Sequence, residues 1–192
     1  MTFRQLSQEE FVNHSASCNQ RSFMQTVEME KLLAKRGFTC QYVGHTNEHG
    51  ELTISAVLYS MPMTGGLHME INCGPVSTNP HDLQHFYREL KTYAKENGAL
   101  ELIVKPYETY QIFDSNGQPT SLEKTELIKD LTDLGYEFDG LQTGYPGGEP
   151  DWHYVKDLTG ITTDKLLNSF SKNGKSTVKK ANTFGIQLKK LK

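Results

Sequence analysis

The sequence is poor in the features that mark secreted and membrane-spanning proteins. Its 192 residues include three cysteines, Cys18, Cys40 and Cys73, which are widely spaced and form no CxxC pair. Unbridged thiols of this kind are typical of a reducing cytosol. The longest apolar runs, such as residues 54–59, are far too short to cross a bilayer. The first residues, MTFRQLSQEEF, have no basic segment followed by an apolar one. We therefore predict a cytoplasmic protein.

The chain also lacks the residue patterns of common catalytic and metal sites. It has no GxSxG motif and no HExxH motif, and its glycine-rich segments lack the Walker lysine. Four of the seven histidines form two spaced pairs, His45 with His49 and His81 with His85. Since no cysteine cluster accompanies these pairs, we interpret them as surface histidines and predict no metal site.

Acidic residues are missing from the end of the chain. From Lys165 onward there are eight lysines and no aspartate or glutamate, whereas the preceding 164 residues carry the other 12 basic groups and all 23 acidic ones. The net charge of −3 therefore combines an acidic body of −11 with a basic end of +8. A local cationic field indicates either a phosphate-bearing partner or a solvated lysine face.

Hydrophobic periodicity predicts a mixed α/β (α+β) fold with a sheet flanked by helices. Ser7 and Glu10 have the spacing of a helix capping box. Residues 39–44 and 52–60 are expected to pair as a hairpin, and residues 100–104 to form a central strand. Other expected strands are 2–6, 67–72, 136–139, 152–156 and 186–191, and expected helices are 25–36, 80–97, 122–134, 162–170 and 175–182. In the helix at 25–36 the expected buried residues are Val27, Leu32 and Leu33.

Several long strings resemble the Fem/Mur (FemABX) family of peptidoglycan interpeptide-bridge aminoacyltransferases. They are SFMQTVEMEKLLAKRGF, LYSMPMTGGLHMEINCGP, FYRELKTYAKENGALELIVKPYETYQ, LIKDLTDLGYEFDGLQTGYPGGEPDWHYVKDL and LLNSFSKNGKSTVKKANTFGIQLKKL. The strings span nearly the whole chain in order. Within the family they are most similar to the streptococcal MurN-type enzymes, which add alanine.

The resemblance implies a fold and a reaction. The fold is a pair of N-acetyltransferase-like (GNAT-like) domains, here residues 1–158 and the beginning of a second domain at 159–192. The reaction is transfer of an amino acid, alanine in the MurN-type enzymes, from aminoacyl-tRNA to the stem-peptide amine of lipid II or another peptidoglycan precursor. It implies no metal or organic cofactor, no role for DNA, and a cytoplasmic enzyme that can contact the inner face of the membrane peripherally.

The resemblance also implies particular site residues. Other members carry a lysine for the acceptor phosphate near the end of the second helix, followed three positions later by an aromatic residue. Lys35 and Phe38 have this spacing; Lys31 is the other candidate, and Arg36 adds a third cation. In the basic end, the expected contacts to precursor phosphate or tRNA are Lys175, Lys179 and Lys180.

Two departures from the family pattern bear on catalysis. The aspartate that precedes a proline in several relatives is Lys105 here, so that no carboxylate role carries over, and Glu108 is a speculative substitute. Family members are also about twice as long, which predicts an N-terminal fragment whose catalytic residues lie in the missing second domain and which is inactive alone. The alternative reading is a non-catalytic RNA-binding module that uses the basic end as a phosphate clamp.

Overall fold

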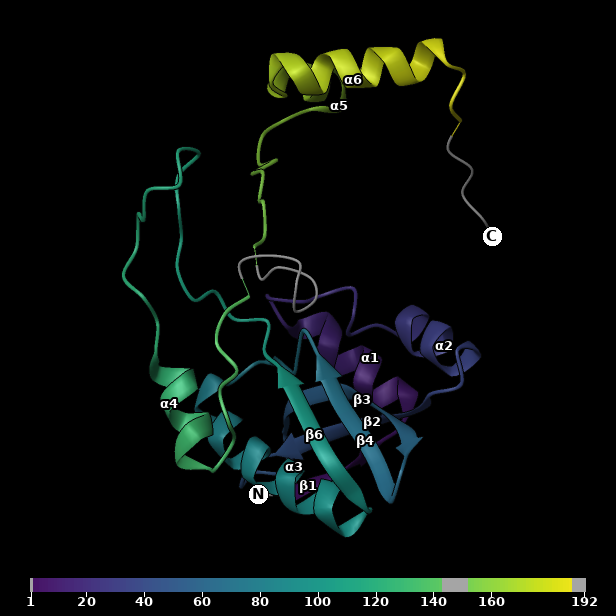
Figure 1. The fold of residues 1–192 in the computed structure, drawn as a ribbon, viewed down its shortest axis with the longest axis vertical. Helices are drawn as coiled ribbons and strands as arrows, with labels where there is room; N and C mark the ends of the chain where they lie inside the picture. Colours follow the sequence, from purple (N-terminus) through teal and green to yellow (C-terminus); the bar gives the residue numbers. More distant parts are fainter. Residues whose placement is uncertain (1, 143–151, 188–192) are drawn as a thin grey trace. The chain divides into compact units, whose positions relative to one another are not determined.

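The computed structural model describes residues 2–142 and 152–187 (Figure 1). The chain divides into two compact units, Met1–Asp139 and Gly140–Lys192. The boundary predicted between residues 158 and 159 falls inside the second unit. None of the helices in the described ranges is both long enough and apolar enough to cross a membrane.

The first unit contains a mixed sheet with the strand order β1-β2-β3-β4-β6, and β5 pairs with β3 beside this path. Strands β1 to β4 are antiparallel neighbours, whereas β4 and β6 are parallel and lie side by side in Figure 1. The predicted mixed class and the predicted hairpin are therefore confirmed. The strands are β1 (Thr2–Leu6), β2 (Thr39–Thr46), β3 (Leu52–Met63), β4 (Gly66–Asn72), β5 (Val76–Ser77) and β6 (Ala99–Lys105).

Helix α3 (Leu83–Glu96), preceded by the short 3-10 helix η1 (Pro80–Asp82), covers one face of this sheet. Its buried residues Phe86, Tyr87, Leu90 and Ala94 pack against apolar side chains of β2, β3 and β4 in one core cluster. Apolar residues three and four positions apart form one stripe on a helix, so that the sequence pattern correctly predicted this buried face.

The opposite face carries α1 (Gln8–Ser17) and α2 (Val27–Lys35) over the β1–β3 part of the sheet. Ser7 caps α1, and the predicted capping box with Glu10 is present. In α2, Leu33 is buried, but Leu32 is 41% exposed, so that the prediction of a buried Leu32 was wrong. Leu32 and Leu33 are successive residues and point about 100° apart around the helix, so that Leu33 faces the sheet and Leu32 does not.

Gln25 joins α2 to the sheet at the place where β3 separates from β4. The β3–β4 pairing ends at Tyr59, and β5 pairs with β3 further along, which leaves the amide of Val57 between them. The Gln25 side chain accepts a hydrogen bond from Val57 N (2.7 Å) and donates one to Asn72 O (2.8 Å). A side-chain amide thus replaces a missing peptide partner in a buried ladder.

Four other predictions about elements were wrong. Strand β6 lies at the end of the described strand order rather than in its centre, because it pairs with β4 on one side. Helix α4 (Glu126–Asp133) is shorter than residues 122–134. Residues 136–139 and 152–156 form no strand. In the first of these segments, Tyr136 packs on Tyr87 and donates to its carbonyl, so that its side chain is used for packing on α3.

The second unit contains short helices in its described residues. They are α5 (Thr163–Leu166), η3 (Leu167–Ser169) and α6 (Lys172–Thr183). These agree with the helices expected at 162–170 and 175–182, although α6 begins earlier because Ser171 caps it. The strand expected at 186–191 lies outside the described residues from 188 onward.

Replacing Gln25 tests whether this amide holds the sheet together. In Gln25→Ala, Val57 N and Asn72 O lose a buried partner, and we expect the free energy of unfolding to fall by about 2–5 kcal/mol. Urea denaturation followed by circular dichroism measures this change. Gln118→Ala is the control, since Gln118 is exposed and its side chain forms no hydrogen bond in the described structure. Equal midpoints for the two variants would contradict the assignment.

His14 makes the stability of the fold depend on pH. It is buried on α1 with Nδ1 2.7 Å from Ser55 Oγ, and burial lowers the pKa of its imidazole below 6.5. Because the unfolded chain then binds more protons, the free energy of unfolding falls as the pH decreases through 6.5 towards the lower folded pKa. We expect a flatter stability profile between pH 7 and pH 5 for His14→Asn than for the parent chain, measured by urea denaturation. The exposed His49→Asn should keep the parent slope.

Candidate functional site

Three cations gather at the end of α2. Lys31 and Lys35 are one helical turn apart and therefore lie on one side of α2, and Arg36 caps its C-terminus. All three are exposed, and within the described residues their side chains form neither a hydrogen bond nor an ion pair. The negative end of the helix dipole favours cations here in any protein. Three unpaired cations nevertheless leave a full positive field available for an anion such as a phosphate.

Phe38 connects this cationic end of α2 to the sheet. It is half-buried, and its ring packs edge-on against Tyr59 of β3, with ring centroids 5.4 Å apart and an interplanar angle of 84°. The positive φ of Gly37 (92°) turns the chain between Arg36 and Phe38. The structure thus brings the four residues predicted for the acceptor site together at one end of one helix.

Beside Tyr59, the β4–β6 part of the same sheet face carries a cluster of charged residues, which we call the carboxylate cluster: His68, Glu70, Glu101 and Lys105. His68 Nδ1 lies 2.6 Å from Glu101 Oε2, and His68 Nε2 lies 3.4 Å from Glu70 Oε2. Lys105 Nζ lies 2.9 Å from Glu70 Oε1. Lys105, at the position where the resemblance implies an aspartate, is therefore the ion-pair partner of a carboxylate on the neighbouring strand.

Sequence reasoning missed the carboxylate cluster. The alternation of polar and apolar residues along residues 67–72 places His68 and Glu70 on one face, and the same holds for Glu101 and Lys105. However, only the parallel register, which pairs His68 with Glu101 and Asn72 with Lys105, brings the two strands' charges together. Burial and the neighbouring Glu70 charge raise the pKa of Tyr59, which fixes its hydroxyl as a neutral group beside the cluster.

A cavity of about 310 Å³ opens where β4 and β6 end, and Glu108 lines it. Its other lining groups include Ser17, Asn19, Cys73 and the buried Tyr87, whose pKa is raised by burial and by nearby Tyr136 and Glu108. No lysine, arginine or histidine is among the described lining residues. Such a cavity suits a neutral polar group or a cation rather than a phosphate.

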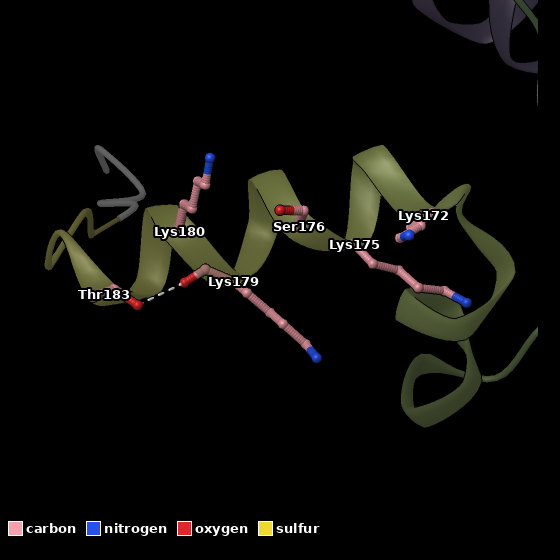
Figure 2. A pocket seen from close by; sticks show the side chains of 6 residues that line it. All are labelled: Lys172, Lys175, Ser176, Lys179, Lys180 and Thr183. Carbon is pink, nitrogen blue, oxygen red and sulfur yellow. Dashed lines mark hydrogen bonds between the residues drawn. The ribbon is translucent and has the colours of Figure 1, made fainter.

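In the second unit, α6 presents a lysine face. Lys172, Lys175, Ser176, Lys179, Lys180 and Thr183 line a shallow hollow of about 510 Å³ (Figure 2). In this view Lys175 and Lys179 point to one side of the helix and Lys180 to the other, while Thr183 Oγ1 donates to the carbonyl of Lys179 (3.0 Å). The three lysines predicted from the sequence therefore share one helix with a fourth, Lys172.

The thiols of Cys18 and Cys40 are poorly suited to nucleophilic catalysis, and the described histidines are not grouped for metal binding. Burial raises the pKa of Cys18, and burial together with the Glu30 charge raises that of Cys40 to about 11, so that both are poor nucleophiles. In the part of the chain that the structure describes, no three His, Cys, Asp or Glu side chains are grouped to hold a metal ion.

The chain is similar to known proteins in sequence and in fold. The chain is 26% identical over 193 aligned positions to an aminoacyltransferase FemB of Staphylococcus epidermidis (strain ATCC 12228 / FDA PCI 1200), covering 98% of this chain and 46% of that protein. A second FemB of Staphylococcus epidermidis matches equally well. The chain thus spans about half the length of these curated relatives.

Among solved structures, the crystal structure of FemX has the same fold. It matches with a TM-score of 0.67 and 19% identity, over 95% of this chain and 44% of that one. A ribosomal-protein-alanine N-acetyltransferase from Brucella melitensis biovar Abortus 2308 matches more distantly, with a TM-score of 0.39 and 18% identity over 55% of this chain and 80% of that one. The family model of the FemAB family matches residues 6–192. The chain belongs to the FemAB family.

Proposed function

We propose that these residues are part of an aminoacyltransferase that builds the interpeptide bridge of peptidoglycan. The proposed reaction moves an amino acid, alanine, from aminoacyl-tRNA to the stem-peptide amine of lipid II or a related precursor, in the cytoplasm and at the inner face of the membrane. The relatives are about twice as long, so that the activity is proposed for a protein of their length that contains this chain.

The single observation that carries the proposal is the set of unpaired cations at the end of α2, in a chain of this family. Lys31, Lys35 and Arg36 are free to hold the pyrophosphate of a lipid-linked precursor. Phe38 and Tyr59 then form an aromatic surface between that phosphate and the carboxylate cluster. A precursor whose phosphate lies on α2 would extend its peptide over the β3–β6 face.

The chemistry that such a site must support is aminolysis of an ester. The acceptor amine loses a proton and attacks the aminoacyl carbonyl carbon, a C–N bond forms, and the ester C–O bond to the tRNA ribose breaks. Holding both substrates in the attacking geometry supplies much of the rate acceleration. The α2 cations would contribute by binding and orientation, since a phosphate remote from the reacting atoms is held in the ground state and the transition state alike.

Neutralising Lys35 tests this assignment in a protein of the relatives' length. In Lys35→Gln, the loss of a charged hydrogen bond of about 1.5–3 kcal/mol should raise the KM for the precursor roughly ten- to hundredfold and leave kcat nearly unchanged. Alanine transfer from Ala-tRNA to the precursor measures both constants. Lys124→Gln, which changes an exposed lysine in the loop before α4, is the control. An unchanged KM for Lys35→Gln would rule out the phosphate contact.

The lysine face of α6 favours a second candidate function, a non-catalytic RNA-binding module. Lys175, Lys179 and Lys180 occur in a helix without acidic residues, which is the charge pattern of a sequence-independent phosphate contact. The two functions differ in one measurable respect. An RNA-binding module binds charged and uncharged tRNA equally, whereas the transferase requires recognition of the aminoacyl ester.

The salt dependence of RNA binding measures how many α6 lysines contact phosphate. For poly(U), each phosphate contact contributes about 0.7 to the slope of log affinity against log salt concentration, so that Lys175→Gln/Lys179→Gln should lower the slope by about 1.4. Fluorescence anisotropy at several salt concentrations measures it. Lys95→Gln/Lys124→Gln, which removes two exposed lysines of the first unit, is the matched control. Equal slopes for both double variants would show that α6 makes no such contact.

A further inference from the structure

Glu70 is an unusual carboxylate for a strand in this sheet. Its side chain is only 10% exposed, and its Oε1 atom lies 2.9 Å from Lys105 Nζ. A buried carboxylate normally has its oxygens fully engaged, because a charge removed from water without partners is costly. Among the described residues, the ammonium of Lys105 is therefore the cation that engages Oε1.

The other oxygen of Glu70 is held in place. His68 Nε2 lies 3.4 Å from Oε2, and His68 is in turn held through Nδ1 by Glu101. Tyr59, which pairs with Glu70 across the strands and packs against Phe38, stands beside the carboxylate as a neutral phenol. The charged and titratable groups that face Glu70 are thus His68, Glu101, Tyr59 and Lys105, from three strands.

Lys105 is a replaceable partner for this carboxylate. It is the last residue of β6, and its side chain is 58% exposed, so that its ammonium can move into water when another ammonium takes its place beside Glu70. Glu70 is nearly buried and therefore needs a cationic partner in either case. The pair shows at the same time that a primary ammonium on a flexible alkyl chain fits against Oε1 of Glu70.

We propose that Glu70 binds the primary ammonium of the acceptor, and that Lys105 occupies this position until the acceptor displaces it. The proposal rests on the proposed function for the identity of the acceptor, an alkylammonium on the stem peptide. The ligand class itself, a primary aliphatic ammonium, follows from the intramolecular ammonium of Lys105 that lies against Oε1 of Glu70.

The binding step positions the amine, which must still lose a proton before aminolysis. An alkylamine with a pKa near 10.4 arrives as an ammonium at neutral pH and cannot attack a carbonyl. The bound ammonium passes one proton to solvent, which gives the free amine. The amine's second proton leaves with the ribose oxygen when the ester C–O bond breaks, so that atoms and charge balance.

The test uses two probes that differ only in the ammonium. Nα-acetyl-lysine amide carries a free ε-ammonium, and Nα,Nε-diacetyl-lysine amide does not. Each is titrated into the isotope-labelled 192-residue chain while the carboxyl carbon of Glu70 and the amides of β4 and β6 are followed by NMR. We expect saturable shifts at Glu70 and Lys105 with the first probe and none with the second.

Three variants test whether Glu70 binds the ammonium. Glu70→Gln should weaken binding of the ammonium probe at least about tenfold, since a charged partner becomes a neutral amide. Lys105→Met should tighten binding about two- to fivefold, because the internal competitor is gone; this gain cannot arise from unfolding. Asp133→Asn is the matched control, as it removes the carboxylate of another lysine pair, with Lys129, that is exposed on both sides.

The outcomes separate this inference from the proposed function. Equal shifts with both probes, or binding unaffected by Glu70→Gln and by Lys105→Met, would overturn the ammonium site. If the ammonium probe binds as described but a protein of the relatives' length transfers no aminoacyl group, the site stands and the proposed function is wrong. If a protein of the relatives' length transfers an aminoacyl group but the ammonium probe binds all variants equally, the ammonium site at Glu70 is wrong and the proposed function stands.

Discussion

The hydrogen bonds of the Gln25 side chain are the constraint on which the arrangement of the first unit depends. Strand β3 has to pair with β4 at one end and with β5 at the other, and Val57 lies between the two pairings. The amide of Gln25 fills this gap from the residue just before the N-cap of α2. The same contact therefore closes the sheet and fixes the start of α2, whose far end carries the unpaired cations.

The two faces of the sheet have different chemistry because of simple alternation along its strands. In β4, Met69 and Ile71 point to α3 and join the apolar core, whereas His68 and Glu70 point to the opposite face. Helices α1 and α2 cover that face over β1 to β3. Polar groups are thus concentrated over β4 and β6, next to the aromatic pair of Phe38 and Tyr59.

Local patterns in the sequence predicted the elements whose stability is local. The capping box at Ser7, the hairpin of β2 and β3 and the apolar stripe of α3 depend on residues close together in the chain. The exposure of Leu32, the edge position of β6 and the meeting of Glu70 with Lys105 depend on which strands become neighbours and in what register. Likewise, the cations at α2 could be named from the sequence, but their lack of partners could not.

The close approach of Gly74 to Gln25 constrains how this family member can change over time. A Cβ atom at position 74 would lie 2.6 Å from Cδ of Gln25, so that any side chain there would push the amide out of its place between the strands. A lineage that keeps glutamine at position 25 must therefore keep glycine at position 74. Substitutions at the two positions would have to occur together. Positions 25 and 74 should therefore covary among related sequences.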